Sequence, residues 1–369
     1  MLMAKITLPG LIDPHVHLRD PGQTEKEDFY TGTCAALAGG YTIVLDMPNN
    51  KVPISTFDRL GEKIKIAKGK AVCDIGFYFG SLGDNLDEFK KIAPPVFDPE
   101  GSDPEWAGGQ VFGIKLYLNQ TTGNFLINES ALSRVFSAIP LRLLILVHAE
   151  GDTLENVLKV LREHKKNTHI CHISLASELK QIINAKNEGL PITCGVTPHH
   201  LFLTENDVKN LGPFGKMRPP LRSKKDVDFL WKNLKYIDVI ESDHAPHTLD
   251  EKNSNNPPNG VPGLETTLPL LLTVASENRL TIEEILRLCY ENPKKIFKIQ
   301  TDKNTKTEID LSKLYIIENR YLHTKCGWSP FNNWKVKGKV ERVFIRGTKV
   351  FENGKVLVQP GFGKVINPL

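Results

Sequence analysis

The chain has 369 residues, 40% hydrophobic and 24% charged, a composition that excludes disordered, collagen-like and coiled-coil proteins. Its formal net charge of only +4 argues against a dedicated nucleic-acid or membrane-surface binder. No stretch approaches the roughly 20 apolar residues of a membrane span, the N-terminus does not resemble a signal peptide, and the six cysteines are scattered, so we expect a cytoplasmic protein with reduced thiols.

Apolar, β-branched runs alternate with amphipathic stretches along most of the chain. Residues 153–164, for example, carry apolar side chains at i, i+3, i+4 and i+7, which predicts a helix. Helices are also predicted over residues 177–187, 226–234 and 128–136, the last of these capped by Asn128. The eight apolar runs lie near residues 6–17, 41–47, 73–80, 111–118, 143–148, 169–173, 191–196 and 237–242.

Eight buried strands alternating with helices predict an α/β fold, a (β/α)8 barrel over residues 10–300. An open doubly wound sheet is the competitor, but no G-x-G-x-x-G follows the first run, so its dinucleotide-binding form is unsupported. Residues 1–9 and 301–369 are expected to form a small β-rich extension and wrap. Within this extension, residues 336–358 alternate between apolar and polar and predict hairpins, whereas residues 301–334 look irregular. In the barrel itself, residues 94–109 predict an insertion loop.

The sharpest motif is DPHVHLR, residues 13–19. Because strand side chains alternate between faces, His15 and His17 share one face, about 7 Å apart along the strand. Two imidazoles so placed can chelate one divalent metal. On this motif alone, two hydrogen-bonded core histidines are an equally good interpretation.

Further ligand-type residues end other predicted strands. In a barrel the C-terminal strand ends converge on one mouth, where active sites lie. Burying polar groups there without a ligand would be costly, so a metal centre is the better interpretation of the whole set. Its members are His15, His17, Lys115, His148, His172 and Asp243.

Lys115 is unusual in this set, because metal cations would repel a free ammonium. A neutral amine can instead take up carbon dioxide as a carbamate, whose two oxygens could bridge two metals about 3.5–4 Å apart. The alternative is a lysine on the outer strand face that reaches water.

The segments HVHLR, MPNN, GIKLYLN, HAE, HICH, TPHHLFL, SDHAPHT and PGLET resemble those of the dihydroorotases. More narrowly, they are similar to the dihydroorotase domain of the eukaryotic multifunctional pyrimidine-biosynthesis polypeptide. The resemblance implies an amidohydrolase barrel in which a carboxylated lysine bridges two zinc ions, acting reversibly on carbamoyl aspartate and dihydroorotate. We also expect a homodimer and, if the chain is an excised domain, other domains of that pathway as partners.

The resemblance also implies a role for each site residue. One zinc would be held by His15, His17 and Asp243, and the other by His148 and His172, with carboxylated Lys115 between them. Asp243 would also be the catalytic proton carrier. The implied substrate contacts are Arg19, Asn49 and His247 for the carboxylate, Arg218, Pro262 and Gly263 for the ring amide, and Thr121 in a loop that closes over the substrate.

Two places depart from the animal-type pattern. Those members usually carry a glutamate at the position of Gly195. That glutamate binds an additional metal together with a first-motif histidine and a cysteine that matches Cys171. Because that oxygen ligand is missing here, we do not expect a third metal, and we interpret Cys171 as a packed thiol. In the loop, Thr122 replaces a phenylalanine, so we expect closure to be less apolar unless Phe125 substitutes.

Three other functions compete with this prediction. A related cyclic amidase, such as a hydantoinase, dihydropyrimidinase or allantoinase, would share the metal ligands but not the carboxylate contacts of Arg19, Asn49 and His247. A non-catalytic assembly domain is disfavoured because all six ligand positions are retained. A structural zinc module is disfavoured because such sites are closed by four ligands.

Overall fold

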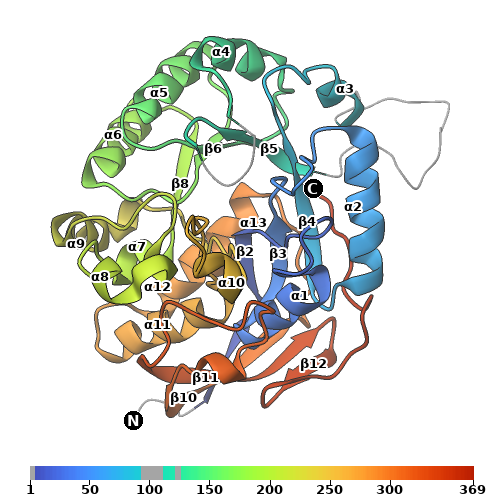
Figure 1. Cartoon of the computed structure of the whole chain (residues 1–369), viewed down its shortest axis with the longest axis vertical. Coiled ribbons are helices and arrows are strands. Elements are labelled where there is room, and N and C mark those ends of the chain that lie inside the picture. The colour runs from blue at the N-terminus through green and yellow to red at the C-terminus, as the bar shows by residue number, and fades with distance from the viewer. Residues whose placement is uncertain (1–4, 93–110, 121–125) are drawn as a thin grey trace.

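A computed structural model describes residues 5–92, 111–120 and 126–369, and it shows a helix-ringed barrel with a small sheet at its side (Figure 1). Eight parallel strands follow one another around the barrel in chain order. A bridge between Val16 and His244 brings the first strand beside the end of the last, so the predicted (β/α)8 fold is confirmed. The strands are β2 (Leu11–Val16), β3 (Tyr41–Asp46), β4 (Asp74–Gly80), β5 (Val111–Tyr117), β6 (Ile145–His148), β7 (Thr168–Ile170), β8 (Ile192–Val196) and β9 (Val239–Ile240).

The helices begin and end where capping and apolar periodicity place them. Asn128 accepts a hydrogen bond from the Ser130 N–H as the predicted cap of α4. The predicted apolar face of α5 is buried, and it consists of Leu154, Val157, Leu158 and Leu161. None of the helices in the described residues is both long and apolar enough to cross a membrane. Those helices are α1 (Phe29–Ala38), α2 (Phe57–Lys70), α3 (Glu88–Ile92), α4 (Glu129–Ala138), α5 (Thr153–His164), α6 (Ala176–Asn187), α7 (Pro198–Phe202), α8 (Val208–Leu211), α9 (Lys224–Lys232), α10 (Leu249–Lys252), α11 (Leu264–Ser276), α12 (Ile282–Leu286) and α13 (Asn292–Ile296).

The second sheet joins the two ends of the described chain. Its antiparallel strands lie in the order β1 (Lys5–Pro9), β10 (Lys306–Ile316), β11 (Lys335–Ile345), β12 (Thr348–Glu352) and β13 (Lys355–Val356). The turns at Arg346-Gly347 and Asn353-Gly354 have positive φ at both residues, the geometry of two-residue hairpin turns. The predicted hairpins are therefore confirmed, and the first residues join the same sheet by pairing with β10 instead of with the hairpin strands.

One expectation about this region is wrong. Residues 301–334 were expected to be irregular, yet β10 occupies eleven of them and lies between β1 and β11. Its register against β11 shifts at two places, and these irregularities interrupt the alternation that would have marked a strand. The predicted insertion loop at 94–109 lies outside the described residues.

The barrel interior is filled below the candidate ligands. Ile12, Phe112 and Leu146 belong to one buried apolar cluster, and each precedes a predicted metal ligand on the same strand by two or three residues. Since the strands are parallel, this apolar layer fills the N-terminal part of the barrel and leaves the ligands at the C-terminal mouth.

Candidate metal centre and substrate pocket

The first predicted ligand group comes together at the ends of β2 and β9. The Nε2 atoms of His17 and His15 lie 2.9 and 3.5 Å from the same Asp243 oxygen, Oδ1. All three side chains are buried, and their donor atoms lie within 4.8 Å of one another. Two ligands of a tetrahedral zinc ion lie about 3.3 Å apart, so this group fits a single metal.

The second group is formed by the histidine that ends β6 and the histidine that follows β7. His148 Nδ1 lies 3.2 Å from His172 Nε2, again the separation of two ligands on one metal. Burial lowers the pKa of both imidazoles, which therefore stay neutral with lone pairs available. The other ring nitrogen of His148 contacts the Glu150 carboxylate at 3.0 Å, which fixes the orientation of the ring.

Lys115 projects into the barrel from β5. Its Nζ donates to Cys171 Sγ at 3.0 Å and lies 4.9 Å from the centre of the Tyr117 ring. The residue is fully buried. The alternative in which Lys115 reaches water on the outer face is therefore wrong, and the amine lies among the predicted ligands.

Three site residues have a left-handed backbone just after a strand end. Arg19, His172 and Asp243 have φ values of 64°, 36° and 43°, a conformation that non-glycine residues seldom adopt and that is often found at functional sites. Strand β7 ends at Ile170, so strict alternation does not apply to the two residues that follow. Cys171 and His172 consequently both face the barrel interior, where Cys171 contacts Lys115 and His172 lines the pocket.

Glu241 is the residue at this centre that the sequence analysis missed. Its fully buried carboxylate lies 3.2 Å from His15 Nδ1 and accepts a hydrogen bond from the His172 backbone N–H. A Cβ on Gly195 would overlap this carboxylate, so an oxygen ligand reaches the place where we expected none. It comes from the residue that directly follows β9 and not from β8. The signal was present in VIESDH, where Glu241 and Asp243 alternate onto one face.

A pocket opens above the two ligand groups. Arg19 is buried at its wall, where its Nε donates to the Pro246 carbonyl at 3.2 Å and one Nη lies 3.3 Å from His247 Nε2. Asn49 Oδ1 contacts His17 Nδ1 at 2.5 Å. The pocket is lined by His15, His17, Arg19, Asn49, Tyr117, His148, His172, Arg218, Asp243, Ala245, Asn259 and Gly260.

The other predicted substrate contacts are placed differently. Pro262 and Gly263 line a separate small cavity beside His244 and Trp328. His247 is buried behind Arg19, and burial together with that guanidinium lowers its pKa to about 3, so that it is a neutral hydrogen-bonding group. Thr121 and the rest of the predicted closing loop after Gln120, with Thr122 and Phe125, lie outside the described residues.

Comparison with known proteins agrees with this geometry. Residues 6–98 match the model of the amidohydrolase family. The chain is 44% identical over 361 residues to multifunctional protein CAD of Squalus acanthias. The aligned region makes up 97% of this chain but only 15% of that protein. It is 37% identical over 376 residues to a dihydroorotase of Pyrococcus furiosus, covering 98% of this chain and 85% of that enzyme. The chain belongs to the dihydroorotase family.

Solved structures extend the likeness beyond dihydroorotases. The L-hydantoinase (dihydropyrimidinase) of Arthrobacter aurescens superposes with a TM-score of 0.87 at 25% identity, over 98% of this chain and 88% of that one. An inactive dihydroorotase-like domain of a CAD-like multifunctional protein from Chaetomium thermophilum gives a TM-score of 0.80 at 25% identity, over 98% of both chains. A dihydroorotase fold thus occurs with more than one substrate and also without activity, so the choice of function depends on the site.

Proposed function

We propose that the chain is a zinc-dependent dihydroorotase that interconverts N-carbamoyl-L-aspartate and L-dihydroorotate in pyrimidine biosynthesis. One arrangement carries the proposal: neutral histidines and Asp243 form two adjacent ligand groups in a pocket that also contains the buried guanidinium of Arg19. Two zinc ions there would polarise the ring carbonyl and lower the pKa of the attacking water. His15, His17 and Asp243 would hold one ion, and His148 and His172 the other.

Lys115 is proposed to be carboxylated. Within the described residues its amine contacts a thiol and an aromatic ring, not a carboxylate, and a buried ammonium without a carboxylate partner is costly. Addition of carbon dioxide to the neutral amine forms an N–C bond and releases one proton. The product is an anion with two oxygens, which suits a position between two metal-binding groups.

Asp243 is proposed as the proton carrier. Its carboxylate lines the pocket beside the histidines, so it can take a proton from the attacking water and deliver it to the departing ring nitrogen. In the reverse direction the same oxygen accepts the proton of the amide. Asp243→Asn should therefore lose both directions while the protein remains folded, as circular dichroism would show, and near wild-type turnover in either direction would remove this role.

The substrate carboxylate is assigned to Arg19. A guanidinium offers parallel N–H donors that match a carboxylate, and that of Arg19 is fixed by Pro246 and His247. Asn49 and Arg218 line the same pocket and complete the proposed substrate contacts with His247. We also propose a homodimer and, because the curated relatives include multifunctional proteins, other enzymatic domains as partners.

The alternative function is hydrolysis of hydantoins, which the superposition on L-hydantoinase favours. The test is to assay the zinc-loaded chain with dihydroorotate, carbamoyl aspartate and hydantoin between about pH 5.5 and 9. Ring closure consumes a proton, so the equilibrium should shift roughly tenfold per pH unit towards dihydroorotate as pH falls. Turnover of hydantoin without dihydroorotate would establish the alternative, and metal-loaded protein inactive on all three compounds would indicate a non-catalytic assembly role.

A further inference from the structure

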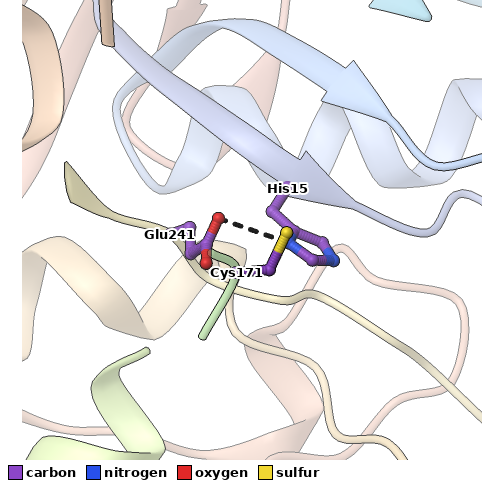
Figure 2. A group of neighbouring side chains, drawn as sticks. All are labelled: His15, Cys171 and Glu241. Atoms are coloured by element: carbon purple, nitrogen blue, oxygen red, sulfur yellow. Dashed lines mark hydrogen bonds and ion pairs between the residues drawn. The ribbon is translucent and has the colours of Figure 1, made fainter. Parts of the chain in front are cut away.

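We infer that His15, Cys171 and Glu241 form a third cation site, in which Glu241 supplies the oxygen ligand. The inference rests on the proposed function only in that His15 is shared with the metal group of His17 and Asp243. Figure 2 shows the three side chains converging from separate segments that follow or end β2, β7 and β9. Their nitrogen, sulfur and oxygen donors lie within 4.8 Å of one another, and all three residues are buried.

The chemistry of the donors suits zinc or a similar ion. Imidazole nitrogen, thiolate sulfur and carboxylate oxygen are the three ligand types that zinc takes in proteins. His15 presents Nε2 to Asp243 and Nδ1 to Glu241, so its two nitrogens face two different ligand groups. A histidine that binds a metal through each nitrogen must give up its ring proton to solvent, as must the Cys171 thiol.

Gly195 makes room for the carboxylate. Strand β8 lies beside β9, with Gly195 paired to Val239, and any side chain at Gly195 would overlap the Glu241 carboxylate. Acidic side chains at both positions would compete for the same space. The absence of a side chain at Gly195 therefore leaves the space that Glu241 fills from the segment directly after β9.

The charge of Glu241 is the second argument. In the part of the chain that the structure describes, its ion contacts are with imidazoles, His15 at 3.2 Å and His169 at 3.7 Å, and not with a lysine or an arginine. Burying a carboxylate without a fixed positive charge is costly. A divalent cation between Glu241, His15 and Cys171 would supply that charge.

The competing explanation needs no ion. Glu241 could accept the Nδ1 proton of His15 and simply orient that ring, as carboxylates often do beside metal-bound histidines. The two explanations differ in the number of ions bound and in whether Cys171 is a ligand, so both can be measured directly.

The test uses the full chain, stripped of metal and titrated with Co²⁺. We expect three ions per chain and near-ultraviolet absorption from cobalt–thiolate charge transfer. Glu241→Gln and Cys171→Ser should bind two ions, and Cys171→Ser should lose the thiolate band. Cys194→Ser is the matched control, because Cys194 is also buried and lies on neighbouring β8; it should keep both the third ion and the band.

The most direct test moves the carboxylate from position 241 to position 195. The double variant Gly195→Glu/Glu241→Ala moves the carboxylate back to β8, and it should recover the third ion and the band that Glu241→Ala alone loses. Wild-type protein with two cobalt ions and no thiolate band would overturn the inference, even if every variant failed to fold. Dihydroorotate turnover is measured separately: three ions with the band but no turnover would refute the proposed function and leave this site established.

Discussion

A buried ion pair should hold the first motif in position. Lys63 Nζ on α2 lies 2.6 Å from Asp46 Oδ2 at the end of β3, and the two side chains are 0% and 1% exposed. Lys63 also donates to the Met47 carbonyl at 2.8 Å, while the other Asp46 oxygen accepts from the Leu18 N–H at 2.7 Å. The pair thus joins α2 and β3 to the residue that precedes Arg19.

Lys63→Met is the perturbation that tests this connection. Methionine retains much of the apolar stem but leaves the Asp46 carboxylate buried without its cation, which should cost about 3–5 kcal/mol of unfolding free energy near neutral pH. Burial already raises the pKa of Asp46, and Lys63 opposes that rise. Without Lys63 the folded pKa rises further above its unfolded value, so the cost should shrink as falling pH protonates the carboxyl.

Urea unfolding followed by tryptophan fluorescence measures the cost. Lys63→Met/Asp46→Asn removes the buried charge and should recover about half of the loss, since the amide leaves only hydrogen bonds to satisfy. Lys70→Met is the control, because the Lys70 side chain is 41% exposed in its ion pair with Asp20, and it should change stability by under about 1 kcal/mol. A loss below about 1 kcal/mol for Lys63→Met, or one independent of pH, would refute the reasoning.

Three further predictions concern the site and the terminal sheet. Lys115→Ala should abolish turnover and lower bound zinc, as assays and metal analysis would show; wild-type turnover would exclude the carbamate. Arg19→Lys should lose one charge-assisted hydrogen bond, about 1.5–3 kcal/mol or roughly 10- to 150-fold in kcat/KM for dihydroorotate, with zinc content unchanged; an unaltered kcat/KM would remove Arg19 from the carboxylate site. The hydrogen bond to Glu265 raises the pKa of His323. The stabilisation of the folded protein by protonated His323 is therefore complete below the unfolded pKa, near 6.5, and is lost as pH rises through the folded pKa. His323→Gln should abolish that part of the pH dependence in urea unfolding between about pH 5.5 and 8.5, and an unchanged profile would contradict it.

The barrel could be predicted because its signals are local. The α5 helix was predicted with its observed bounds, since an apolar face and a polar start coincide in one segment. Where register decides the outcome, local patterns are insufficient. The run at 237–242 contains a strand of only two residues, and β10 was missed because its pairing shifts against β11.

The residues of the candidate site also divide into those that a local pattern predicts and one that it does not. The six predicted ligands were recognisable because each lies at or near the C-terminal end of a strand, and parallel strands bring those ends together. Glu241 was missed because its role depends on what the adjacent strand leaves open. The spacing in VIESDH puts Glu241 on the same face as Asp243, but only the pairing of β8 with β9 shows that its carboxylate occupies the space beside Gly195.

The terminal sheet has a consequence for the order of folding. Strand β1 precedes all the barrel strands along the chain, yet its partner β10 follows them, with Lys5 opposite Asp310. The barrel strands pair with their immediate successors, so they close much shorter loops and should assemble first. The small sheet should therefore form last and should acquire hydrogen-exchange protection after the barrel. Until then β1 exposes an unpaired edge, and this interval is when the nascent chain is most open to pairing with another copy.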